Sequence, residues 1–277
     1  MAQANRKTFF LLLAPSAVLL AFFILPLGVA VITSFEFPHP SLRHYQRLVS
    51  VPVYQAVYLK TLRIAFTTTL VSLLLAYPCA FYISRLSSNA RTIAVLLITV
   101  PFMLSVLVRN YVWIILLQDT GLFNRMLLGS GLSSAPVRLM YNELGVTIAM
   151  VNMLVPYILF PSLSALLAIP RDLELASSSL GASGVQTFLS VTAPLSANGA
   201  AAGCLLTFIV SLGFYVTPAM LGGTREMMIS NLVAFNVREL LNWPLAFSLA
   251  TTLLASTIVL YLIYSLLVPS STTIRAV

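Results

Sequence analysis

The sequence predicts an all-α membrane protein that crosses the bilayer six times. Of its 277 residues, 59% are hydrophobic and only 8% are charged, whereas a soluble domain carries about 25% charged residues. Six apolar runs are each long enough to cross the hydrocarbon core, which takes about 20 residues. The runs are continuous and do not alternate as the strands of a membrane β-barrel would. We therefore expect a single polytopic membrane domain over residues 1–277.

The expected spans are separated by polar loops. They cover residues 8–33, 61–83, 92–117, 144–168, 197–221 and 245–268. Between the first two spans, residues 41–59 are expected to form one or two short surface helices, and residues 222–244 a helical loop. An even number of spans places both termini on one side of the membrane.

The first span is expected to be retained rather than removed as a signal peptide. Its apolar run is longer than the hydrophobic region of a signal peptide, which has about 7–15 residues, and a small-x-small cleavage site is lacking. Pro15 and Pro26 also lie within the run.

Prolines and glycines inside the later spans predict bends and close packing. Each internal proline removes a backbone hydrogen bond and tends to kink its helix, although membrane helices also tolerate proline. These prolines are Pro101, Pro156, Pro161 and Pro218. Gly199 and Gly203 have the Gly-x-x-x-Gly spacing that lets two membrane helices approach closely.

A polar stretch over residues 171–194 separates the fourth and fifth spans. Backbone groups in lipid must be satisfied internally, so such a segment belongs in water or against a protein. Asp172 and Glu174 suit the first turn of a helix, and Gly181 suits a left-handed cap at its end. The expected helix is roughly 15 Å long, too short to span, and its predicted apolar ridge is formed by Leu173, Ala176, Ser177 and Leu180.

This stretch resembles the cytoplasmic loop of permease subunits of binding-protein-dependent ABC importers. That loop reads Glu-Ala-Ala, three residues, Gly, nine residues, Ile, one residue and Leu-Pro. Aligned on Gly181, the spacing matches throughout, with Leu175, Ala176 and Ser177 before it and Val191, Ala193 and Pro194 after it. Leu175 stands where the glutamate is expected, Ser177 replaces the second alanine, Ala193 replaces the leucine, and Glu174 is one residue early.

The resemblance implies a type I ABC importer permease fold with a core over about 60–268. The loop would be the coupling helix that docks on the ATPase, through Leu173, Glu174, Leu175, Ala176, Ser177, Leu180, Gly181, Ala182 and Pro194. The implied partners are a cytoplasmic ABC ATPase dimer, a second homologous permease and a periplasmic substrate-binding protein in a bacterial inner membrane. ATP and Mg would be bound by the ATPase, and this chain would need no cofactor.

Three further segments, 108–124, 154–174 and 211–223, are similar to the permease subfamily that includes the spermidine/putrescine importers. Polar residues in the third to fifth spans are the candidates for a substrate path: Arg109, Asn110, Asn152, Tyr157 and Tyr215. Each could instead satisfy a contact between helices. Arg109 could also extend to the surface or pair with Asp119 or Glu143.

The expected solute is small and polar, such as a polyamine-like, opine or amino-acid-like molecule. A polycation would need carboxylates to replace its water, and no acid lies inside a span. We therefore expect an anionic or otherwise polar group on the solute rather than a simple polyamine, unless a partner permease supplies the acids.

The residues that several other functions would require are absent from the sequence. There is no phosphate-binding Gly-x-x-x-x-Gly-Lys-Ser/Thr motif, no His/Cys cluster for a metal, and no pair of catalytic groups inside a span. The net charge of +8 is spread along the chain, which disfavours nucleic-acid binding. A stand-alone carrier or an intramembrane enzyme stays as the alternative.

Arg6, Lys7, Arg85 and Arg91 favour cytoplasmic termini, although the opposite side carries more basic residues overall.

Overall fold

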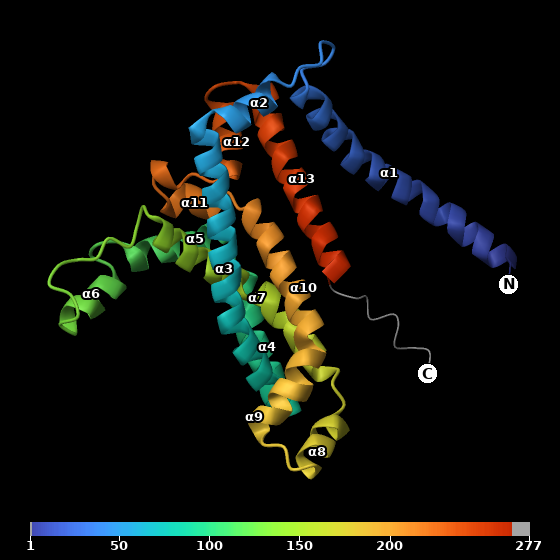
Figure 1. Ribbon diagram of the computed structural model, residues 1–277, viewed down its shortest axis with the longest axis vertical. Coiled ribbons are helices and arrows are strands. Elements are labelled where there is room, and N and C mark those ends of the chain that lie inside the picture. Colours follow the sequence, from blue (N-terminus) through green and yellow to red (C-terminus); the bar gives the residue numbers. More distant parts are fainter. Residues whose placement is uncertain (1, 268–277) are drawn as a thin grey trace. The chain divides into compact units, whose positions relative to one another are not determined.

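The structure is a computed structural model that describes residues 2–267. All regular elements in this part of the chain are helices (Figure 1). In order they are α1 Ala2–Ser34, α2 Arg43–Ser50, α3 Pro52–Arg85, α4 Ser88–Phe102, α5 Val106–Leu117, α6 Leu122–Gly129, α7 Glu143–Leu167, α8 Arg171–Ser179, α9 Gly184–Thr187, the π-helical turn η1 Phe188–Thr192, α10 Ala193–Leu212, α11 Val216–Leu221, the 3-10 turn η2 Thr224–Glu226, α12 Ile229–Arg238 and α13 Trp243–Leu267.

The prediction of an all-helical protein with six spans is confirmed. Within the described residues, five helical stretches are long and apolar enough to cross a membrane: Pro15–Ser34, Pro52–Arg85, Glu143–Leu167, Gly184–Leu212 and Trp243–Leu267. The sixth is the pair Ser88–Phe102 and Val106–Gly129, which is bent by 89°. Val268, the last residue of the expected sixth span, lies outside the described residues.

The third span is not the continuous helix that the sequence predicted over 92–117. It ends at Phe102 and resumes at Val106. Pro101 has no N–H to donate, and the chain leaves the helix just after it because the turn cannot be extended regularly. Ser105 has a non-helical backbone, with φ of −53° and ψ of 138°, and the chain changes direction there into α5.

The fifth span also differs from its prediction, because the helix stops at Leu212 and does not run on to Leu221. Gly213 follows as the cap, and a separate short helix, α11, begins at Val216. Pro218 cannot donate to the carbonyl of Phe214 four residues earlier. The Ser230 hydroxyl donates to that carbonyl at 2.6 Å instead.

The second span begins earlier than predicted. α3 starts at Pro52, where a proline is well suited to the first helical position. Its first turns take in part of the region 41–59, and α2 forms the one separate short helix there.

Contacts divide the chain into two compact units. The first comprises the residues up to 55 together with 232–255. In it the Ser34 hydroxyl contacts the Tyr45 hydroxyl at 2.7 Å, and the Ser248 hydroxyl donates to the Ser34 carbonyl at 3.1 Å. His44 Nε2 lies 2.8 Å from Glu36 Oε1. These bonds tie the end of α1 to α2 and to the first turns of α13.

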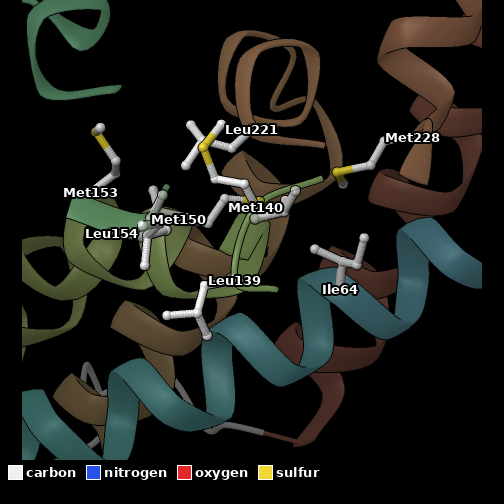
Figure 2. Packing of buried hydrophobic residues seen from close by; sticks show 11 residues of the cluster. Ile64, Leu139, Met140, Met150, Met153, Leu154, Leu221 and Met228 are labelled. Atoms are coloured by element: carbon white, nitrogen blue, oxygen red, sulfur yellow. The ribbon is translucent and has the colours of Figure 1, made fainter. Parts of the chain in front are cut away.

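The second unit comprises 56–231 and the residues from 256 onward. Its centre is α7, which is buried on most of its faces. One core cluster joins α7 to Ile64 of α3, Leu221 of α11 and Met228 (Figure 2). A second cluster packs α7 against small residues of α3, Ala76 and Ala80. Small side chains there allow the two helices to lie close together.

The predicted close approach of the fifth span is confirmed. A Cβ on Gly199 would lie 2.5 Å from the Ala165 Cβ, and one on Gly203 would lie 2.8 Å from the Ile158 Cα. α10 therefore packs against α7 through its two glycines. The Tyr77 hydroxyl, 2.6 Å from the Ser196 hydroxyl, joins α10 to α3 as well.

Candidate functional site

Residues 171–194 fold as the short helices α8 and α9, the π-helical turn η1 and the first residues of α10, and α8 and α9 lie at one end of the second unit (Figure 1). α8 covers the predicted helix, and Gly181 has the predicted left-handed backbone, with φ of 86°. α9 begins with a capping box in which Ser183 and Gln186 bond reciprocally. The Ser177 and Thr187 hydroxyls, 3.0 Å apart, hold α8 against α9.

The apolar side chains of this loop are exposed. Leu180 is 90% exposed, Leu175 is 62% exposed and Leu173 is 44% exposed. Ala176 and Pro194 are exposed as well, whereas Ala182 is half-buried. Ser177 turns toward α9 and leaves the predicted face. The exposed ridge therefore consists of Leu173, Ala176 and Leu180 from that face, together with Leu175. An exposed apolar patch outside the spans marks a surface suited to a protein partner.

Glu174 points back toward its own chain. Its two carboxylate oxygens accept from Nη1 and Nη2 of Arg85, both at 2.5 Å, and Oε1 also accepts from the Thr192 hydroxyl at 2.9 Å. The hydrogen bonds from Arg85 hold the pKa of the Glu174 carboxyl below its usual value of 4.5, and they outweigh the opposing effect of partial burial. Glu174 therefore ties α8 to the end of α3.

A cavity of about 650 Å³ lies between α3, α4, α5 and α7. Its walls are mainly apolar, and among its lining residues, all of which the structure describes, Arg109 alone carries a charge. The walls comprise Val71, Leu75, Leu97, Ile98, Pro101, Phe102, Arg109, Trp113, Leu144, Thr147, Ile148, Val151, Asn152, Val155 and Pro156. This volume is in the range of small-molecule sites.

Polar groups from two helices, α5 and α7, meet at this cavity. The Trp113 indole N–H donates to the Asn152 Oδ1 at 3.2 Å. The Arg109 guanidinium carbon lies 5.6 Å from the centre of the Phe102 ring, and its Nε is buried without an acceptor among the described residues. The Tyr157 ring packs edge-on against Phe102 at 5.5 Å, one layer behind the wall.

The other two predicted path residues lie away from the cavity. Asn110 is fully buried, accepts from the Thr217 hydroxyl at 2.9 Å and donates to the Val106 carbonyl at 3.0 Å. Tyr215 precedes α11, and its carbonyl accepts from the Asn231 amide at 3.0 Å. Both belong to the packing of α11 against its neighbours in this conformation.

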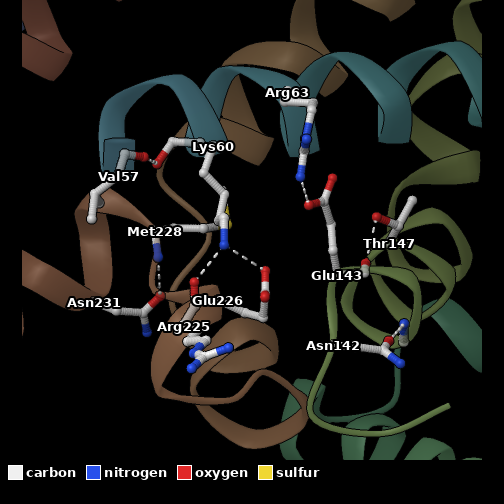
Figure 3. Close-up of polar contacts among 12 residues, drawn as sticks. Val57, Lys60, Arg63, Asn142, Glu143, Thr147, Arg225, Glu226, Met228 and Asn231 are labelled. Atoms are coloured by element: carbon white, nitrogen blue, oxygen red, sulfur yellow. Dashed lines mark hydrogen bonds and ion pairs between the residues drawn. The ribbon is translucent and has the colours of Figure 1, made fainter. Parts of the chain in front are cut away.

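Glu143 forms an ion pair with Arg63 of α3 (Figure 3) and so leaves Arg109 without that partner. Beside it, Lys60 Nζ lies 3.0 Å from Glu226 Oε2 and donates to the Arg225 carbonyl. These pairs fasten α3 to the start of α7 and to η2. The sequence does not indicate these pairs because the partners are far apart along the chain, and Phe102 and Trp113 were not predicted as cavity residues either.

Comparison with known proteins decides the family. The family model for the inner membrane component of binding-protein-dependent transport systems matches residues 68–272. The chain belongs to this family of ABC importer permeases. The predicted family and the type I permease fold are therefore confirmed.

Relatives and solved structures agree with this assignment. The permease is 32% identical over 213 residues to the spermidine/putrescine transport system permease PotB of Escherichia coli K12, with 77% of each chain covered. The corresponding Haemophilus influenzae protein is 31% identical over 221 residues, covering 79% of this chain and 77% of that one. A bacterial ABC transporter that imports alginate has a chain of the same fold, with a TM-score of 0.79 at 15% identity and 95% and 96% of the two chains covered.

Membership in the family fixes the general role. The chain is the membrane permease subunit of an ABC importer, is not itself an enzyme, and is expected to hold no cofactor. It works in a complex with an ATPase and a periplasmic binding protein, as a multi-pass protein of the bacterial inner membrane.

Proposed function

We propose that this permease carries a small organic solute with at least one anionic group, such as an opine-like or amino-acid-like molecule. The observation behind this proposal is the charge of the cavity between α3, α4, α5 and α7. Arg109 is its single charged wall residue, and the arginine Nε has no protein acceptor among the described residues. A guanidinium in a largely apolar site favours a carboxylate or phosphate oxygen as its ligand.

The polyamine permeases among the relatives support a small organic solute, whereas the charge of the cavity disfavours a purely cationic one. Spermidine and putrescine are polycations, and they would need carboxylates to replace their water. No carboxylate lines the cavity, and Arg109 would repel them. Polyamine transport remains the second candidate, because the sequence likeness to PotB favours it and a partner permease could contribute acids.

We also propose that the ridge of α8 couples solute movement to ATP. Leu173, Leu175, Ala176, Leu180, Gly181 and Ala182, with Pro194 beyond them, would dock on a cytoplasmic ATPase dimer, whereas Ser177 and Glu174 would brace the helix from behind. A second homologous permease would complete the path, and both termini would be cytoplasmic. Residues 1–277 would act as one permease domain that rocks when ATP binding closes the ATPases.

The test is uptake by vesicles that hold the whole complex. Polyamines and anionic or zwitterionic solutes would each be tested as competitors of the cognate solute. Uptake would also be compared between the wild type and the variants Arg109→Ala and Arg109→Lys. A lost charged contact of about 1.5–3 kcal/mol corresponds to a tenfold to hundredfold weaker uptake. Arg125→Ala, at an exposed arginine of α6, is the control and should retain wild-type uptake. Exclusive uptake of spermidine or putrescine, undiminished by Arg109→Ala, would overturn the proposal.

A further inference from the structure

A second cavity, of about 190 Å³, lies behind the coupling helix and carries several charges. It is bounded by the ends of α3 and α7, the start of α4, α8 and η1. Three of its walls are arginines, Arg85, Arg91 and Arg171, and one is a glutamate, Glu174. We call it the arginine pocket, and its remaining walls are Ser84, Leu166, Leu167, Ile169 and Thr192.

The one carboxylate of the arginine pocket is already engaged. Glu174 accepts two hydrogen bonds from Arg85 and one from Thr192. Arg171 acts on it through its charge at longer range. One carboxylate offsets one guanidinium, so the pocket retains an excess of positive charge carried by Arg91 and Arg171.

Arg91 is held in place by its own loop. Its Nη2 donates to the carbonyls of Ser84 and Leu86, both at 3.0 Å. Its Nε is buried and has no acceptor among the described residues. A buried charged donor without a partner is costly, and the Arg91 side chain lines a space that could hold an acceptor. The Arg91 guanidinium is therefore already held in position beside a space where a ligand oxygen could bind.

We infer that the arginine pocket binds a phosphate group. Guanidinium groups match phosphate oxygens in geometry and charge. The pocket lies where α3 and α7 end, α4 begins and the polar loop starts, at the level expected for lipid headgroups. Basic pockets between helices on the cytoplasmic side are suited to anionic lipid headgroups. The phosphodiester of an anionic phospholipid and free inorganic phosphate share this chemistry.

The phosphate site rests on the coupling role proposed above, because that role places the arginine pocket on the cytoplasmic side of the membrane. Arg85, Arg91 and Arg171 come from the ends of three different helices, α3, α4 and α8. A phosphate among them would hold α8 to α3 and α4 in addition to the Arg85–Glu174 pair. Occupancy would thus stiffen the connection between the ATPase surface and the spans.

Thermal unfolding of the full-length chain, purified with the subunits that accompany it, tests this inference. The probes are short-chain phosphatidylglycerol, phosphatidylcholine of equal chain length and sodium phosphate. Wild-type protein is expected to unfold at a higher temperature as phosphatidylglycerol is added, with little effect of phosphatidylcholine. Arg171→Gln, which changes an exposed side chain, and Arg91→Gln are expected to need at least tenfold more phosphatidylglycerol for the same shift. Arg125→Gln removes one charge elsewhere and should match the wild type.

The outcomes separate the sources of the phosphate. A shift with phosphatidylglycerol alone assigns the pocket to a lipid headgroup, and an equal shift with sodium phosphate alone assigns it to free phosphate. No shift with either probe, or an undiminished shift in both pocket variants, would overturn the inference. Because no transported solute is present, a negative result would leave the proposal about Arg109 standing, and the uptake experiment is likewise independent of this pocket.

Discussion

Arg85 and Glu174 form a two-point ion pair between the end of α3 and α8, with both N–O distances at 2.5 Å. The Arg85 guanidinium also lies over the Phe81 ring, 4.9 Å from its centre. Phe81 packs in turn on Phe188 of η1 at 5.2 Å. Residues 171–194 are thus fastened to α3 through both α8 and η1, so a force on α8 would reach a membrane span directly.

Glu174→Gln should weaken this connection. The Arg85 side chain is 45% exposed, so the expected loss is that of a surface pair, about 0.2–1 kcal/mol. The measurement is the unfolding temperature of the purified complex together with the ratio of transport to ATP turnover. Asp172→Asn, an equal charge change on the exposed side of the same helix, is the matched control. Equal effects of the two variants would contradict a specific role for the pair.

The same pair predicts a loss of stability in acid. The folded-state pKa of Glu174 lies below its usual value of 4.5 because Arg85 stabilises the carboxylate. The contribution of the pair is therefore complete above about pH 4.5 and declines as the pH falls through the folded-state value. Unfolding temperatures of wild type and Glu174→Gln, measured from neutral pH downward, should converge in this acidic range. A difference that stays constant down to the lowest pH would argue against this assignment.

Gly203→Ala should destabilise the contact between α10 and α7. The added Cβ would lie 2.8 Å from the Ile158 Cα and 3.1 Å from the Tyr157 carbonyl oxygen, which are backbone atoms that cannot rotate away. Overpacking of this kind costs about 1–3 kcal/mol. Gly213→Ala is the control, since its nearest neighbour is 3.9 Å away. Thermal unfolding of both variants decides the matter, and similar stabilities would refute close packing at Gly203.

The helical class and most span positions were predictable because they depend on local composition. The apolar runs, the glycine spacing of α10 and the cap at Gly181 are all properties of neighbouring residues. Pro101 and Pro218 indicated bends in these spans, but the full breaks after Phe102 and Leu212 were not predicted, since membrane helices also accommodate proline without a break. The carbonyl of Phe214 is satisfied by Ser230, sixteen residues later, and no periodicity within the span indicates this.

The candidate site was predictable only in part, for a similar reason. Arg109 and Asn152 were selected as polar residues in spans, and both line the cavity. Asn110, one residue after Arg109, faces a different direction because successive helical residues are rotated by about 100°. Its partner Thr217 and the partner of Glu174, Arg85, lie far away in sequence. Long-range pairs of this kind are set by the fold rather than by any local pattern.

Gly181→Ala should disturb the coupling loop through the backbone alone. A Cβ at Gly181 would meet nothing within 4 Å, but its φ of 86° is unfavourable for any other residue, at about 1–2 kcal/mol. Gly184→Ala is the matched control, since it is equally open and lacks the positive φ. The expected result is weaker co-purification of the ATPase for Gly181→Ala only. Unchanged recovery of the ATPase with Gly181→Ala would remove this turn from the docking surface.

Cysteine labelling at Asn152 and Asn110 should distinguish the cavity from the packing around α11. Asn152 is exposed in the cavity wall, whereas Asn110 is fully buried with its amide bonded to Thr217 and Val106. In a chain whose Cys79 and Cys204 are replaced, Asn152→Cys should react quickly with a small polar thiol reagent. Asn110→Cys should react at least tenfold more slowly.

The labelling also reports on motion if it is repeated with ATP and with the solute-loaded binding protein. Protection of Asn152→Cys by solute would place the solute in the cavity with Arg109. Labelling of Asn110→Cys that appears only with ATP would mean that α5 and α11 separate during the cycle, because the reagent cannot reach this buried position while the two helices remain packed together. Equal reaction of both cysteines in every state would contradict the path described here, since the two residues lie in different environments.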